Sequence, residues 1–394
     1  MRIDKIEVKT IQNSRGEDTI EIELFLDSGE SGIASVPQGA STGEREAVSL
    51  PAEDAVSKIN GIIIPALLEK DFETQDEFDD FLVELDGTED KSRLGGNSLL
   101  SLSLAFARAN AKEQNKDLYQ YIADIAHTTP SLPRFYMNLV NGGKHGTNNL
   151  AFQEYMVIAS ANSAQSQLDL GKKIFARLKE KASDLVSELR YGDEGGLNID
   201  LENIEKPLQS LNEVIKEFNL QDNVNLALDV AASSFYKDGK YLVDGEELSA
   251  EQLTELYKNL TKKYSITSIE DPFEENQFQD YATLKKSLDA LIVVGDDLTT
   301  TNETYIKKAI QSDAINGLIV KPNQIGTLTE TLEAIKVAYE NNVRCIISHR
   351  SGDTMDDFIA DLAYGVGAYG LKAGAPEPKE RMAKYNRIIA IDGR

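Results

Sequence analysis

The feature that most constrains the fold is an alternation of short apolar runs with amphipathic stretches, which begins near residue 135. Between the runs, apolar residues recur at helical spacing, as they do over residues 328–339. Alternating strands and helices indicate a parallel sheet, and eight strands favour a closed barrel over a doubly wound open sheet. No Gly-x-Gly-x-x-Gly follows the first strand, which argues against the open sheet. The eight runs span residues 135–139, 152–158, 225–229, 266–270, 291–296, 317–321, 344–349 and about 366–372.

The first third of the chain has strands first and helices after them. Residues 20–26 alternate between apolar and mostly charged side chains, which indicates a strand with one buried face. Helical spacing then extends over about 52–126, where Asn97 is expected to cap a mostly buried helix. The stretch 128–133 is rich in Thr and Pro and has the composition of a linker. We therefore predict two domains, an N-terminal α+β domain and a catalytic barrel, over residues 1–128 and 129–394.

A charged or polar side chain ends six consecutive runs. At the C-terminal ends of barrel strands such side chains converge on one mouth, where βα-barrel enzymes have their active sites. The start of a loop explains any one of them, but six in succession are harder to explain in that way. We predict a polar site at this mouth, built from Asp229, Glu270, Asp296, Lys321, His349 and Lys372.

Three of these residues, Asp229, Glu270 and Asp296, are carboxylates that need a cation if they are buried together. The chain has one cysteine, Cys345, and three histidines, which excludes a Cys-rich or His-rich zinc site. Oxygen ligands prefer hard cations, so the pattern predicts Mg²⁺, with Mn²⁺ as the alternative. Ca²⁺ fits less well because it takes more ligands.

The two lysines of the set suggest a base. Lys321 and Lys372 would lie beside each other and beside the metal, and a lysine near other cations loses proton affinity. Either lysine could then act as a neutral base. A metal and a lysine base suit the removal of a weakly acidic proton next to a carboxylate.

Two acidic segments supply a candidate acid. Glu154 follows Gln153 in the run 152–158, and Glu194 lies in the glycine-flanked loop 192–196. Glycines let a backbone approach a ligand closely, although an ordinary turn explains this loop equally well. A glutamate across the site from the base could protonate a leaving hydroxyl.

Two loops of small residues could close over a ligand. Residues 37–44 include Ser41, but Glu44 stands where a Walker A loop needs lysine, which leaves a flexible connector or a mobile lid. Residues 141–145 form a similar loop that carries His145.

Charge and composition exclude several classes of protein. The chain has 41 Lys and Arg against 66 Asp and Glu, and the resulting net charge of −25 repels nucleic-acid backbones. A single cysteine is typical of a reducing compartment, and the first residues contain no apolar segment of a secretory signal. Because no apolar run reaches 18 residues, we expect a cytoplasmic protein without a membrane span.

Taken in order, these segments resemble the enolase (phosphopyruvate hydratase) family nearly from end to end. Each segment alone is weakly specific, but the whole series, with its ligands at strand ends, is highly specific. The matching segments are residues 14–16, 39–44, 84–89, 153–154, 192–196, 228–229, 269–272, 295–298, 321–326, 348–352 and 383–386.

The resemblance implies an N-terminal α+β capping domain followed by a modified (β/α)8 barrel. It also implies the reversible dehydration of 2-phospho-D-glycerate to phosphoenolpyruvate with two Mg²⁺ ions per site, in a homodimer or larger homo-oligomer. Enolase-superfamily sites pair a Lys or His base with one or two Mg²⁺ ions. By this resemblance Asp229, Glu270 and Asp296 bind one metal, and Ser41 reaches the second.

The resemblance also assigns roles to the other candidates. Lys321 would remove the α-proton, and Glu194, helped by Glu154, would protonate the departing hydroxyl. The residues that would bind the substrate are His145, Gln153, His349, Arg350, Ser351 and Lys372.

The chain departs from the family pattern in its loops. Asn13 stands where aspartate is usual, Gln38 replaces a serine, residues 144–147 replace Glu-His-Ala-Asp, and a segment after Val48 is largely missing. These changes touch loops that close over the substrate, so they bear on rate and affinity. Two other functions stay open at this point: a superfamily acid-sugar dehydratase, and an enolase-like scaffold that binds a protein with weak catalysis.

Overall fold

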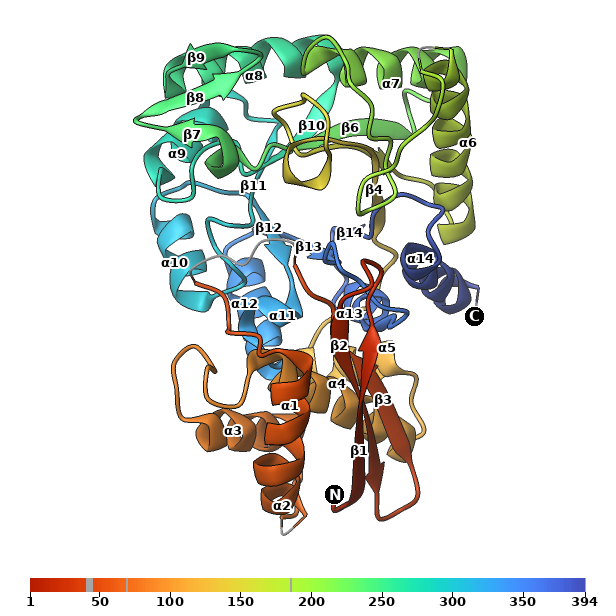
Figure 1. The fold of residues 1–394 in the computed structure, drawn as a ribbon, viewed down its shortest axis with the longest axis vertical. Helices are drawn as coiled ribbons and strands as arrows, with labels where there is room; N and C mark the ends of the chain where they lie inside the picture. Colours follow the sequence, from red (N-terminus) through yellow and green to blue (C-terminus); the bar gives the residue numbers. More distant parts are fainter. Residues whose placement is uncertain (40–44, 69, 185, 394) are drawn as a thin grey trace.

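The computed structural model describes residues 1–39, 45–68, 70–184 and 186–393. A small sheet-and-helix part, in the lower half of Figure 1, is followed in the chain by a wide barrel that fills the upper half. This arrangement confirms the predicted fold class. No helix in the described ranges combines the length and the apolar character needed to cross a membrane.

The N-terminal sheet is antiparallel, with the order β1-β2-β3. The alternating apolar residues of its central strand are all buried, which confirms the predicted one-faced strand. Helix α4 (Gly96–Glu113) packs on this sheet. A Cβ at Gly32 would lie 2.0 Å from the carbonyl oxygen of Ala105, so glycine is what lets α4 approach the sheet so closely. The strands are β1 (Ile3–Gln12), β2 (Asp18–Leu26) and β3 (Ser31–Ser35).

Helices fill the rest of the N-terminal part, as the spacing predicts. The capping role of Asn97 is wrong, because α4 begins at Gly96 with Gly95 at its N-cap. The Asn97 amide instead donates to the carbonyl oxygen of Leu50 at 2.9 Å and accepts from its backbone N–H at 3.0 Å. The other helices are α1 (Ala52–Lys58), a π-helical turn (Ile59–Ile63), α2 (Ile64–Leu67), α3 (Gln75–Asp86) and α5 (Leu118–Ala126).

The barrel closes through eight strands in the order β10-β11-β12-β13-β14-β4-β5-β6, as the count of apolar runs predicts. Its strands are β4 (Arg134–Asn141), β5 (Glu154–Ala159), β6 (Val224–Asp229), β10 (Ile266–Glu270), β11 (Ile292–Gly295), β12 (Gly317–Val320), β13 (Arg344–Ser348) and β14 (Gly370–Lys372).

The parallel sheet that the alternation indicates does not include β5, which runs antiparallel to both β4 and β6 and makes the barrel mixed. The connection from β4 to β5, which lies wholly within the described residues, contains one 3-10 turn (Gly143–His145) and no α-helix, whereas parallel strands are usually joined by a helical crossover. The reversal matters for the site. It brings the first residue of β5, Glu154, level with the last residue of β6, Asp229.

Helices surround the barrel on its outer side (Figure 1). A small three-stranded sheet, β7 (Tyr236–Lys237), β8 (Lys240–Val243) and β9 (Glu246–Leu248), extends the connection after β6. The outer helices are α6 (Ala164–Ser183), α7 (Glu205–Glu217), α8 (Ala250–Tyr264), α9 (Phe278–Ser287), α10 (Glu303–Gln311), α11 (Pro322–Ile325), α12 (Leu328–Glu340), α13 (Phe358–Gly365) and α14 (Lys379–Asp392).

The two parts of the chain are joined by ion pairs and by a backbone bridge. Arg108 on α4 contacts Asp356 at 2.6 Å and Asp357 at 2.9 Å, both in the loop between β13 and α13. The backbones of Gln38 and Gly352 exchange two hydrogen bonds of 2.8 Å. The segment that enters the predicted lid is therefore held against the loop that follows β13.

Candidate active site

A polar cavity opens where the barrel strands end. Of the sequence-predicted site residues, Ser41 lies outside the described residues. Glu270 does not line the cavity itself but bonds Lys372, which does. The other eleven all line it: His145, Gln153, Glu154, Glu194, Asp229, Asp296, Lys321, His349, Arg350, Ser351 and Lys372.

Lys372, at the end of β14, lies at the centre of the acidic side of this cavity and is 2% exposed. Its Nζ is 2.9 Å from both carboxylate oxygens of Glu270 and 3.1 Å from Asp229 Oδ2 and Glu154 Oε2. Burial lowers the pKa of Lys372, but the carboxylates around it outweigh burial and raise that pKa well above its ordinary value. The strand register explains the cluster, because Asp229 and Glu270 are paired residues of β6 and β10.

Lys321 follows β12 and contacts Asp296 through its ammonium group. The other oxygen of Asp296 accepts a hydrogen bond of 3.1 Å from Gln324 Nε2. Burial lowers the pKa of Lys321, yet Asp296 raises it, and the net shift is upward. Lys372 lowers the pKa of Lys321, as predicted, but the neighbouring carboxylates outweigh this effect. The loss of proton affinity beside a bound metal stays a prediction.

Potential metal ligands gather in two groups among the described residues. The ligand atoms of Asp271, Asp296 and Asp297 lie within 4.8 Å of one another, and so do those of His145, Glu154 and Glu194. The sequence-predicted metal triad is divided differently: Lys372 contacts Asp229 and Glu270, whereas Lys321 contacts Asp296.

The cavity carries more negative than positive charge. Its described lining, together with Glu270, holds eight carboxyl groups against four Lys and Arg cations. Burial and Asp229 raise the pKa of Glu270 well above its usual value, and burial and Asp296 raise the pKa of Asp297 to about 7. Crowded, oxygen-only donors of this kind fit a hard divalent cation.

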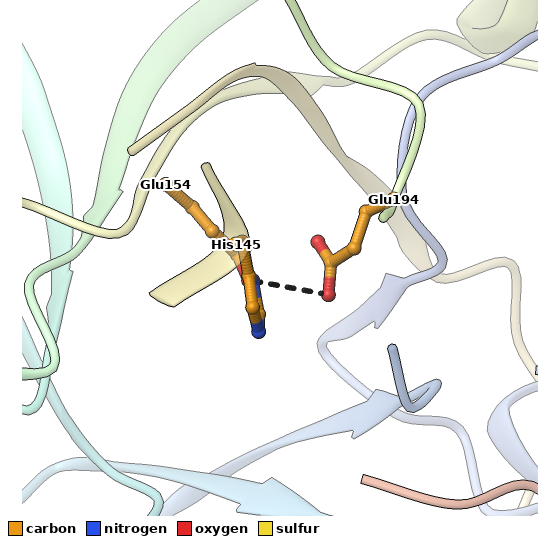
Figure 2. Close-up of side chains that lie close together, drawn as sticks. All are labelled: His145, Glu154 and Glu194. Carbon is orange, nitrogen blue, oxygen red and sulfur yellow. Dashed lines mark ion pairs between the residues drawn. The ribbon is translucent and has the colours of Figure 1, made fainter. Parts of the chain in front are cut away.

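The second group, drawn in Figure 2, combines two glutamates with a histidine. His145 Nδ1 lies 3.3 Å from Glu154 Oε1 and 3.5 Å from Glu194 Oε1. Burial and Glu194 raise the pKa of Glu154 to about 7. Burial also raises the pKa of Glu194, but His349, His145 and Lys372 outweigh it and hold that pKa well below its usual value. Of the two glutamates, Glu154 therefore has the higher affinity for a proton.

The loop after β13 supplies the opposite wall. His349 Nε2 lies 3.2 Å from Glu194 Oε1, and Asn138 on β4 donates to Glu194 Oε2 at 2.9 Å. Arg350 donates to Glu46 Oε2 at 2.9 Å and to Asn323 Oδ1 at 3.1 Å. Across the cavity, Gln153 donates to Asp229 Oδ2 at 3.2 Å.

Sequence reasoning missed several side chains of the site, Asp297 among them. Asn138 lies inside an apolar run, where one polar residue facing the barrel interior was the available signal. Asp271 accepts hydrogen bonds from the backbone N–H groups of Asp296 at 3.0 Å and Asp297 at 2.7 Å, a role that no spacing reveals. Glu46 comes just after the predicted lid and carries no motif of its own.

Comparison with known proteins gives a consistent result over the full length. Residues 3–122 match the family model described as "Enolase, N-terminal domain", and residues 129–394 match "Enolase, C-terminal TIM barrel domain". The chain is 40% identical over 403 residues to the enolase of Methanocaldococcus jannaschii, covering 99% of this chain and 95% of that protein. It is 41% identical over 422 residues to the enolase of Ureaplasma parvum serovar 3 (100% and 96% covered) and 40% over 405 residues to that of Natranaerobius thermophilus (99% and 94%).

Proposed function

Because this chain belongs to the enolase family, we propose that the residues gathered at its barrel mouth carry out the family's reaction in divided roles. The reaction is the metal-dependent dehydration of 2-phospho-D-glycerate to phosphoenolpyruvate and its reversal, in glycolysis and gluconeogenesis. The observation that carries the assignment of roles is the arrangement of the cavity. Lys321 lies beside Asp296 on one side, and Glu194 lies beside His349, His145 and Asn138 on the other.

We assign the metal to the acidic side of the cavity, with Asp229, Glu270 and Asp296 as the ligands of a Mg²⁺ ion. A second Mg²⁺ would complete the pair, with Ser41 of the lid as a ligand. The described lining and Glu270 contain more carboxyl groups than Lys and Arg cations, which favours the binding of divalent cations. When bound, the metal supplies positive charge that stabilises the extra negative charge a substrate carboxylate gains on losing its α-proton.

Lys321 is the proposed base that takes the α-proton. A lysine base must be the neutral amine, whereas Asp296 raises the pKa of Lys321 in this structure. Because Asp296 is also a proposed metal ligand, engagement of its carboxylate elsewhere removes that effect and frees the amine. Lys321 thus forms an ion pair with the carboxylate that controls its pKa, Asp296.

Glu194 is the proposed acid that protonates the departing hydroxyl, with Glu154 as its partner. His145 Nδ1 lies within 3.5 Å of a carboxylate oxygen on each glutamate, so the three side chains form one connected group. The pKa of Glu154, raised to about 7 by burial and Glu194, lets this group hold a proton at neutral pH. Delivery from Glu194 then draws on the proton held by Glu154.

Binding of a trianionic substrate falls to the remaining polar residues. Arg350 follows β13 and Lys372 ends the neighbouring strand β14, and both cations are paired with carboxylates. The substrate must therefore replace Glu46 as the partner of Arg350 and the acidic cluster as the partner of Lys372. His145, Gln153, His349 and Ser351 complete the proposed set.

The direct test of this function is phosphorus NMR of 2-phosphoglycerate incubated with the protein. Phosphoenolpyruvate should appear with Mg²⁺ and should cease to form when EDTA removes the metal. A sugar acid and 3-phosphoglycerate serve as control substrates, and both should remain unchanged. Dehydration of the sugar acid in place of 2-phosphoglycerate would contradict the assignment. The homo-oligomer and the cytoplasmic location stay predictions, for light scattering and cell fractionation to test.

A further inference from the structure

Arg381 is a buried cation that neither the predicted site nor the proposed roles include. It lies in the first turn of α14 with 0% of its surface exposed. A guanidinium group is buried at high cost unless its N–H groups are paired. Its Nε has no hydrogen-bond partner among the described residues, so the contacts concentrate on the two terminal nitrogens.

One of these nitrogens contacts the imidazole of His349. Arg381 Nη1 lies 2.6 Å from His349 Nδ1. Arginine has only donors and stays protonated in proteins, so Nδ1 must be the acceptor and must carry a lone pair. In the neutral ring the proton is then on Nε2, the nitrogen that lies 3.2 Å from Glu194 Oε1. Arg381 thus determines which ring nitrogen of His349 carries the proton.

The same guanidinium joins two loops of the site. Nη1 also donates to the carbonyl oxygen of Arg350 at 2.6 Å, and Nη2 donates to those of Ser351 at 2.6 Å and Asp193 at 3.1 Å. Asp193 immediately precedes Glu194. One side chain therefore fixes the backbone of the loop that carries His349 and that of the loop that carries Glu194.

Gly374 makes room for this convergence. Its φ is +79°, and a Cβ there would lie 2.9 Å from the carbonyl oxygen of Glu194 and 3.1 Å from both Arg381 Cδ and His349 Cε1. A side chain at this position would push the two loops and the guanidinium apart. The backbone N–H of the next residue, Ala375, donates to the same Glu194 carbonyl at 2.9 Å.

We propose that Arg381 is a positioning residue that holds His349 as the Nε2–H tautomer, which places the protonated nitrogen 3.2 Å from Glu194 Oε1. The charged groups that face His349 are Glu194, Arg381 and Asp353. Burial and Arg381 lower the pKa of His349 to about 4, against the opposing effect of Glu194, so the ring is neutral at physiological pH. A neutral ring beside Glu194 does not carry a second proton that could compete with the one Glu194 delivers.

The test is nitrogen NMR of protein labelled at histidine, which is tractable because the chain has three histidines. Shifts assigned with single His→Gln variants should show His349 with a bare Nδ1 and a protonated Nε2. Arg381→Met should change this pattern, because Nδ1 loses its donor. The control is Lys384→Met, which removes another buried cation of α14. Lys384 bonds the Thr354 and Glu380 carbonyls and pairs with Asp353, which Arg381 also contacts, so the variant should leave the His349 tautomer unchanged.

A proton on Nδ1 in the wild-type protein would overturn the proposal, even if Arg381→Met does not fold. Unchanged His349 shifts in a folded Arg381→Met protein would overturn it as well. The catalytic consequence rests on the role proposed for Glu194: kcat should fall about 10- to 100-fold in Arg381→Met, more than KM rises. The tautomer proposal and the proposed function can fail separately. The tautomer is measured without substrate, whereas a wild-type protein that does not catalyse the reaction would refute only the proposed function.

Discussion

Removing the ammonium of Lys372 should destabilise the metal-free protein strongly. Its Nζ lies within 3.1 Å of carboxylate oxygens on Glu154, Asp229 and Glu270, and each of these side chains is at most 5% exposed. Loss of one partner from a buried ion pair costs about 3–5 kcal/mol, because an uncompensated charge is left behind. We expect Lys372→Met, which keeps the apolar stem, to lose about 4 kcal/mol in EDTA.

The assay is urea unfolding of both proteins with EDTA and with saturating Mg²⁺. With an m-value of about 3 kcal/mol per M, the midpoint should fall by roughly 1 M in EDTA. Mg²⁺ should recover more stability in the variant than in the wild-type protein, since it meets the same carboxylates. The loss should also shrink as the pH falls from about 8 to 5, because carboxylates without Lys372 take up protons more readily.

Lys384→Met is the matched control. Lys384 is also buried, but its Nζ donates to two carbonyl oxygens, and its one carboxylate partner, Asp353, keeps Arg381. Its loss should be smaller and independent of Mg²⁺. A Lys372→Met protein as stable as the wild type in EDTA would refute the account of the acidic cluster.

Three further predictions follow from other parts of the molecule. Asp296→Asn should weaken Mg²⁺ binding in calorimetry by at least about 100-fold, and unchanged affinity would remove Asp296 from the metal site. Cys345, fully buried in β13, should react with a thiol reagent at least about a thousandfold more slowly in the folded than in the urea-unfolded protein, and fast labelling of the folded protein would contradict its burial. Asp356→Asn should cost about 2 kcal/mol by weakening the Arg108 contact between the two parts of the chain. Burial raises the pKa of Asp356, but Arg108 outweighs it and the net shift is downward. The stabilisation is therefore present above the unfolded-state pKa and is lost as the pH falls through the folded-state pKa, so equal acid profiles of variant and wild type would count against this contact.

The strands of the barrel could be predicted because each is a short apolar run between helical stretches. The direction of β5 could not, because a strand buried on both faces has the same composition whether it runs parallel or antiparallel. The run predicted to about 366–372 reduces to Gly370–Lys372, since Val366 already packs at the end of α13. Apolar residues occur both at the end of a buried helix and in a strand, so composition alone does not show where β14 begins.

The site residues could be predicted where they end strands, as Asp229 and Lys372 do, or directly follow one, as Lys321 does. Their partners could not, because which carboxylate meets which lysine depends on barrel register and strand order. Arg381 shows the limit most clearly. It lies in a helix with charged neighbours, and only the fold brings its guanidinium between His349 and Asp193.

The central claim, that proton removal and hydroxyl loss belong to different residues, is tested most directly by exchange of the substrate α-proton with deuterated water. Proton NMR of 2-phosphoglycerate with Mg²⁺ gives the exchange rate, and phosphorus NMR gives phosphoenolpyruvate formation in the same sample. Lys321→Ala should lose both activities, whereas Glu194→Gln should keep measurable exchange while dehydration falls by at least about 100-fold. Exchange that persists in Lys321→Ala and disappears in Glu194→Gln would contradict the account and reverse the two roles.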